Sequence, residues 1–84
     1  MNLLDLGLRR GDAVRFRRRE DQRWRAATVS RLEEDGSIGV RDPDGASLSI
    51  PTDRLQVRTA GPRGRLVWVL LSDRLAGTEQ LGLF

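Results

Sequence analysis

Apolar and polar residues alternate with a period of two in five short segments of this chain. In the first segment, Val14 and Phe16 would share one face of a strand, while Arg15 and Arg17 would lie on the other. Turn residues separate the five segments at intervals of roughly 8 to 12 residues, which is typical of a small antiparallel barrel or sandwich. The side chains expected to point inward are Val14, Phe16, Ala27, Val29, Ile38, Val40, Leu48, Ile50, Leu55 and Val57.

Two local patterns refine this expectation of strands. The second strand runs over about residues 23–32, but Leu32 is out of phase with Ala27 and Val29, which predicts a bulge or a sharp bend. Before the fifth strand, residues 51–54 (Pro-Thr-Asp-Arg) do not alternate. The proline suits the first position of a helical turn, and Thr52 or Asp53 could cap it.

The C-terminal third of the chain is harder to interpret. Residues 59–65 contain Gly-Pro and a second glycine, so we expect a linker after a barrel domain at 1–58. The extension at 66–84 begins with the most apolar run of the chain, residues 66–71, which fits a strand or a short helix. A helical turn starting at Ser72 would end at Gly77. We expect Trp68 in the core, and the apolar run could also join a weak homodimer.

Composition restricts the chemistry that the chain can perform. The 84 residues contain no Cys, His, Lys or Tyr, which excludes disulfides, the usual zinc sites and the common nucleophile and base pairs. We therefore expect neither an enzyme nor a cofactor. The chain has no run of about 18 apolar residues and no basic N-terminal region, so we expect a cytoplasmic protein without a membrane span or signal peptide.

Positive charge is concentrated in one part of the chain. The net charge is only +3, but all 15 basic residues are arginines and nine of them fall between positions 9 and 31. Arginines on one face of a strand can each neutralise a phosphate, and a neighbouring tryptophan can stack on a base. These residues predict weak, sequence-independent binding to DNA or RNA through Arg15, Arg17, Arg18, Arg19, Arg23, Trp24 and Arg25.

Residues 11–58 resemble the Tudor domain and related SH3-like barrels. The resemblance rests on Gly-Asp-x-Val at 11–14, Trp-Arg-Ala-Ala-Thr-Val at 24–29 and Ile-Pro-Thr-Asp-Arg-Leu at 50–55. It implies an all-β fold, a small five-stranded SH3-like or Tudor-like barrel, here with a C-terminal extension. Tudor readers of methylated residues use a cage of aromatic faces, but only Trp24 matches such a position. The Gly-Asp-x-Val opening is also similar to KOW-type barrels, which often bind RNA.

The last five residues, Gln-Leu-Gly-Leu-Phe at 80–84, resemble the pentapeptide that binds the bacterial sliding clamp. In that family the Gln side chain bonds at the rim of a pocket, and the final two apolar side chains fill a hydrophobic subsite. Gln80, Leu81, Leu83 and Phe84 match the four defining positions, while Gly82 stands where Ser or Asp is commoner. Residues 77–79 would act as a flexible linker, so that the tail is available to a partner as an extended peptide.

Together these features predict a non-catalytic adaptor in DNA replication or repair. Its tail would bind the sliding clamp and its barrel would bind nucleic acid or protein weakly, which also allows association with the nucleoid. Two alternatives stay open. One is a general RNA- or DNA-binding module without a clamp partner. The other is a protein-interaction module, monomeric or weakly dimeric through residues 66–71, whose tail packs on itself or on a second copy.

Overall fold

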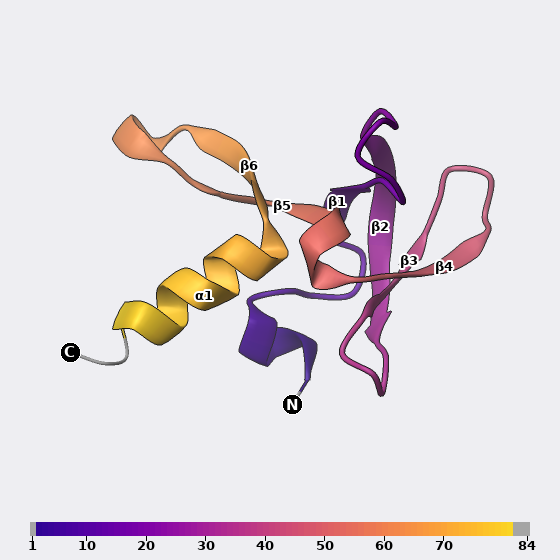
Figure 1. Cartoon of the computed structure of the whole chain (residues 1–84), viewed down its shortest axis with the longest axis horizontal. Helices are drawn as coiled ribbons and strands as arrows, with labels where there is room; N and C mark the ends of the chain where they lie inside the picture. Colours follow the sequence, from indigo (N-terminus) through magenta and orange to yellow (C-terminus); the bar gives the residue numbers. More distant parts are fainter. Residues whose placement is uncertain (1, 82–84) are drawn as a thin grey trace.

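The computed structural model describes the backbone of residues 2–81 and the side chains of residues 2–77 (Figure 1). Six strands, three 3-10 helices and one α-helix follow one another along this part of the chain. Their order is η1 (Leu3–Leu6), β1 (Ala13–Phe16), β2 (Arg25–Leu32), β3 (Ile38–Arg41), β4 (Ser47–Ile50), η2 (Thr52–Arg54), β5 (Leu55–Ala60), η3 (Pro62–Gly64), β6 (Leu66–Leu70) and α1 (Leu71–Leu81).

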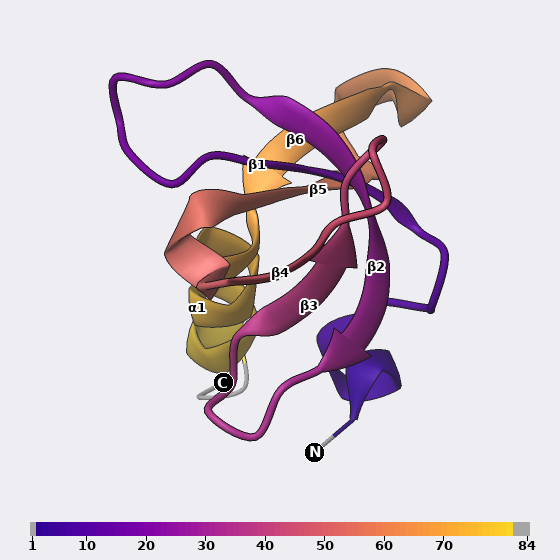
Figure 2. The same cartoon turned by 90° about the vertical axis from the view of Figure 1, so that its right-hand side faces the viewer.

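All six strands belong to one antiparallel sheet in the order β4-β3-β2-β1-β5-β6. The five strands predicted from alternation are all present, and β6 pairs with β5 as a sixth. Within the described residues, β4 and β6 are the two edges, so the pairing does not close the sheet into a five-stranded barrel. The strands twist strongly across one another, and η1 and α1 lie at the same end of the sheet (Figures 1 and 2).

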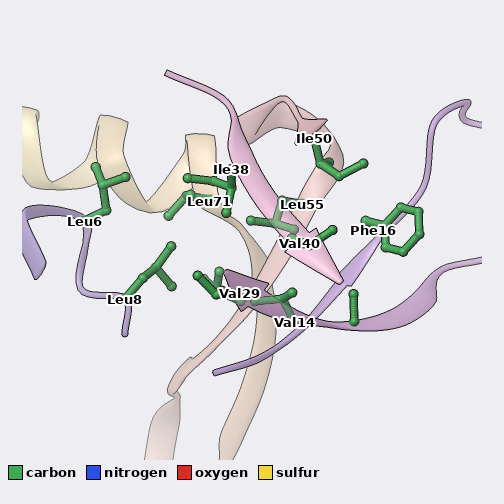
Figure 3. Close-up of a cluster of buried hydrophobic side chains, with 12 residues drawn as sticks. Leu6, Leu8, Val14, Phe16, Val29, Ile38, Val40, Ile50, Leu55 and Leu71 are labelled. Atoms are coloured by element: carbon green, nitrogen blue, oxygen red, sulfur yellow. The ribbon is translucent and has the colours of Figure 1, made fainter. Parts of the chain in front are cut away.

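The core follows the alternation in the sequence. Of the ten side chains expected to point inward, nine are buried, and Leu48 is half-buried against them. Among residues 2–77, three further leucines belong to the core: Leu6 and Leu8 come from the N-terminal segment and Leu71 begins α1 (Figure 3). The burial of these side chains is the main favourable term that holds the fold together.

The two local patterns in the sequence correspond to real features. The pairing of β2 with β3 shifts register between Val29 and Arg31, which is the bulge that the phase change predicted. A 3-10 turn, η2, occupies Thr52–Arg54 directly after Pro51. Its first turn has no side-chain cap hydrogen bond, so the expected capping by Thr52 or Asp53 is wrong.

The C-terminal extension contains both a strand and a helix. Residues 59–65 include the end of β5 and the turn to β6, so they join two paired strands of one hairpin. The helix does not end at Gly77 but continues to Leu81. A glycine inside a helix costs only about 1 kcal/mol relative to alanine. Packing of Leu71 and Leu75 against the core can offset that cost.

A side-chain contact ties α1 to the N-terminal segment. Nη2 of Arg74 donates a hydrogen bond to the main-chain carbonyl of Leu6, the last residue of η1. This carbonyl lies at a helix end, where main-chain acceptors lack partners within the helix. No helix among residues 2–81 is long and apolar enough to cross a membrane.

Candidate nucleic-acid interface

Arginine and tryptophan side chains gather on the face of the sheet that is turned away from the core. We call this surface the outer face. Val14, Phe16 and Val57 point into the core, so Arg15 in β1 and Arg58 in β5 lie on the opposite side. Trp68 in β6 is paired directly with Arg58. Residues far apart in the sequence thus meet on three adjacent strands.

Trp68 is the centre of this cluster. The guanidinium carbon of Arg15 lies 4.3 Å from the centroid of the Trp68 ring, and that of Arg58 lies 5.1 Å from it. Both distances are within the range of a cation–π interaction. Trp68 is half-buried and does not belong to the buried cluster or to the residues packed against it, so its expected place in the core is wrong. The core-facing residue of that part of β6 is its neighbour Val69, which packs against the buried cluster.

A second pair of the same kind lies beside the loop between β1 and β2. The guanidinium carbon of Arg17 lies 4.4 Å from the centroid of the Trp24 ring. Arg17 follows β1, and its main-chain N–H donates to the carbonyl of Arg54 at 3.2 Å, which continues the pairing of β1 with β5. Trp24 immediately precedes β2. Alternation from Arg15 to Arg17 places this pair on the outer face as well.

The other predicted arginines are elsewhere. Arg18, Arg23 and Arg25 line a groove at the mouth of the β1–β2 loop, which Arg17, Phe16, Leu48 and Asp42 also line. The guanidinium carbon of Arg25 is 5.8 Å from the buried Phe16 ring, which places it on the core side of the sheet. Arg19 is exposed and lies 3.7 Å from a carboxylate oxygen of Asp21. The sequence predicted one continuous stripe. In the structure Arg15 and Arg17 lie beside tryptophans, and Arg17 also borders the groove.

The outer face is cationic at its described strand positions, which carry arginines and no carboxylate. The outward positions of β1, β5 and β6 are Ala13, Arg15, Gln56, Arg58, Ala60, Leu66, Trp68 and Leu70, and none of them is Asp or Glu. Stacking on a ring also restricts where a guanidinium group can go, yet leaves its N–H donors at the edge of the plane. Such a surface can attract and bind an anionic polymer.

Sequence reasoning missed two residues of this cluster. Arg58 could have been found, because the alternation of Leu55 and Val57 already turns Gln56 and Arg58 outward. Trp68 could not, because residues 66–70 are apolar on both faces and therefore show no alternation.

The clamp-like peptide lies almost entirely outside the described residues. The main chain of Gln80 and Leu81 belongs to α1, but their side chains, and all of Leu83 and Phe84, are not described. Residues 77–79, which we expected to form a flexible linker, are helical instead.

Among residues 2–77, no three acidic side chains gather in a way that could hold a metal ion. No protein-family model matches this chain, and neither a curated protein nor a solved structure matches it significantly.

Proposed function

We propose that this chain is a non-catalytic adaptor that binds nucleic acid through its outer face and the bacterial sliding clamp through its C-terminal peptide. The observation that carries the first part is the Trp68 ring contacted by both Arg15 and Arg58. Binding to nucleic acid would be sequence-independent, because phosphate contacts carry no base information.

The physical case rests on charge and preorganisation. Each arginine that neutralises a phosphate releases counterions, which supplies binding free energy that decreases with added salt. An arginine already held against a ring loses less conformational freedom on binding than a free one. Trp24 and Trp68 contribute by holding these guanidinium groups in place on the outer face.

The proposed fold type is an SH3-like or Tudor-like barrel formed by β1–β5. The support is the strand order β4-β3-β2-β1-β5 with a 3-10 turn directly before β5, which agrees with the resemblance at 11–58. The hairpin partner β6 and helix α1 would be additions to that barrel. We do not propose reading of methylated residues, since Trp24 is stacked by Arg17 and a cage needs several aromatic walls.

The experiment compares two triple variants with the same change in net charge. One carries Arg15→Gln, Arg17→Gln and Arg58→Gln on the outer face. The matched control carries Arg9→Gln, Arg19→Gln and Arg31→Gln, three exposed arginines outside the cluster, two of them paired with carboxylates. Binding to a labelled single-stranded oligonucleotide is measured by fluorescence anisotropy at several salt concentrations.

We expect the outer-face variant to bind about tenfold or more weakly, and its plot of log affinity against log salt to be shallower by about 2. The control should lose less affinity and keep its slope. Equal losses in both variants would mean that only net charge matters and that the outer face is not a site. No binding by the unmodified chain at low salt would overturn the proposal.

Clamp binding is the second part of the proposed function. Its support is the match of Gln80, Leu81, Leu83 and Phe84 to the four defining positions of the peptide. Helix α1, which leads into this peptide, extends away from the sheet (Figure 1). A short peptide that must become ordered on binding would have micromolar rather than nanomolar affinity.

A titration of a purified bacterial clamp tests this part. The Gln80→Ala/Phe84→Ala variant and a chain without its last five residues should both lose binding, because the anchors are gone. Gly82→Ser is the matched control, since it changes the one position that is not an anchor, and it should keep the affinity. Unchanged binding by the shortened chain would show that the peptide is not the ligand.

A further inference from the structure

Strand β6 leaves one side of its backbone unpaired. Among the described residues it is bonded to β5 on one side and to no strand on the other. Its five residues, Leu-Val-Trp-Val-Leu, carry no charge. The other edge strand, β4, is only four residues long, contains Ser47 and Ser49 and is followed by Pro51. Short polar edges near proline resist pairing with another chain, whereas long apolar edges promote it.

The sequence of β6 reads the same in both directions, with Trp68 at its centre. In an antiparallel pair of two such strands centred on Trp68, each residue is paired with a residue of the same type. Trp68 faces Trp68, Val67 faces Val69, and Leu66 faces Leu70. Two-fold symmetric dimers need a self-complementary patch of this sort.

The hydrogen-bonding pattern of β6 fits the same centre. The N–H of Gly61 donates to the carbonyl of Arg65 at 2.6 Å, so these two residues are a directly bonded pair of the β5–β6 ladder. Bonded and non-bonded pairs alternate along an antiparallel ladder. Val67 and Val69 therefore point their main-chain groups toward β5, while Leu66, Trp68 and Leu70 point theirs to the open edge.

We propose that two copies of this chain form a two-fold symmetric dimer in which their β6 strands pair antiparallel, with Trp68 at the axis. The outward N–H and C=O groups of residues 66, 68 and 70 in both copies would form up to about six hydrogen bonds. The proposal is independent of nucleic-acid or clamp binding.

Charge at the two ends of β6 favours this orientation. The turn before β6 carries the exposed Arg63 and Arg65, and the first turn of α1 after β6 carries the exposed Asp73. Arg74 in the same turn is half-buried and donates to the carbonyl of Leu6. Antiparallel pairing brings the turn of one copy beside the start of α1 in the other, so opposite charges meet at both ends. A parallel arrangement would place like charges together and would also lose the match between identical side chains.

Cysteine cross-linking tests the register, because the chain has no cysteine of its own. Directly bonded residues of an antiparallel pair have Cα atoms about 5.5 Å apart, which is within disulfide range. Trp68→Cys should therefore give a covalent dimer under mild oxidation. Leu66→Cys is the control: its two copies would be about 13 Å apart, so it should remain largely monomeric. Equal cross-linking of both variants would contradict the register.

A second measurement tests for the dimer in chains that keep Trp68. Sedimentation of the full chain from micromolar to millimolar concentration should show a monomer–dimer equilibrium. Leu66→Pro removes a main-chain N–H that points to the open edge. The backbone tolerates this proline, because the preceding Arg65 has a φ of −76° and a ψ of 140°, which suit a residue before proline. We expect this variant to dimerise about tenfold more weakly, whereas Leu66→Ala, which keeps the N–H, should lose less.

Charge reversal tests the orientation. Arg63→Glu with Arg65→Glu should weaken the dimer, and adding Asp73→Arg should restore it, because the opposite charges then meet again. A monomer at every concentration would overturn the proposal, as would a dimer that responds to none of these changes. A dimer that the charge reversals weaken but Asp73→Arg does not restore would contradict the antiparallel order.

Discussion

Strands β1–β5, which we call the body, share one sheet with β6 of the β6–α1 extension, but the body and the extension are held in place very differently. Strands β1 and β2 each pair on both sides, and the buried side chains come mostly from β1–β5. Within residues 66–77, the extension contributes one fully buried side chain, Leu71, with Val69 and Leu75 packed against the core. Regions with few buried contacts open at lower free energy than the rest of a fold. The extension should therefore open at a lower free energy than the body.

The largest effects should come from truncating one buried leucine in each region. Leu55 in β5 and Leu71 in α1 are both 0% exposed. Leu55→Ala should lower the free energy of unfolding by about 2–5 kcal/mol, since it leaves a cavity within the body. Leu71→Ala should instead release α1 locally. Chemical denaturation with hydrogen exchange distinguishes the two.

In the Leu71→Ala variant, amides of α1 should exchange much faster while those of β2 and β3 stay protected. In the Leu55→Ala variant, protection should fall throughout the body. Leu66→Ala is a control for both, because Leu66 is 64% exposed and its truncation should change the free energy of unfolding by less than about 0.5 kcal/mol. Uniform loss of protection in both leucine variants would mean that the two regions unfold as one.

The same contrast explains what could be predicted from the sequence. The body was predictable because its strands bury one face and expose the other, so Val14 and Arg15 or Val57 and Arg58 reveal their sides by alternation. Even the bulge at Val29–Arg31 was visible as a change of phase. In β6 both faces are apolar, and this pattern vanishes.

The candidate site shows the same limit. Arg15 and Arg17 were predicted to face outward from one strand, and they lie beside tryptophans on the outer face. Trp68, the partner of Arg15, is more than fifty residues from it along the chain, and only the pairing of β1, β5 and β6 brings the two together. No local sequence pattern predicts that Arg15 and Trp68 lie side by side.

Two glycines offer a smaller test, with opposite signs in the two regions. Gly7 joins η1 to the body with a φ of +73°, and a Cβ there would lie 3.0 Å from Nη2 of Arg74. Gly7→Ala should destabilise the fold by about 1–2 kcal/mol. Gly77 is inside α1 with open space around it, so Gly77→Ala should stabilise the helix by about 0.5–1 kcal/mol. Thermal unfolding and helix content by circular dichroism measure both changes in stability. A stabilising Gly7→Ala would contradict the close contact between Gly7 and Arg74.

A still smaller gain should come from the turn that connects the body to the extension. Arg63 has a φ of 60° and a ψ of 26°, and the following Gly64 also has a positive φ. The N–H of Arg65 donates to the carbonyl of Pro62 at 3.3 Å, so residues 62–65, which include η3, have the backbone of a type I′ turn and not of a right-handed helix. Asn-Gly is strongly favoured in such a turn. Arg63→Asn should stabilise the hairpin by about 0.5 kcal/mol. Arg65→Asn, at a φ of −76°, should give no gain.

The smallest effect is expected in the turn between β2 and β3, where Ser37 donates hydrogen bonds to the carboxylate of Asp35. The carboxylate accepts hydrogen bonds from the Ser37 hydroxyl at 2.6 Å and from its N–H at 3.0 Å, and both hold the pKa of Asp35 below its ordinary value of 3.8. Ser37→Ala removes the hydroxyl, so an NMR titration should find the pKa of Asp35 raised toward that value. Because the folded-state pKa is lowered, the bond stabilises the fold above the unfolded pKa and stops doing so as pH falls through the folded one. Variant and parent should thus differ slightly near neutral pH and converge in acid, whereas equal pKa values would show that the hydroxyl does not stabilise the carboxylate.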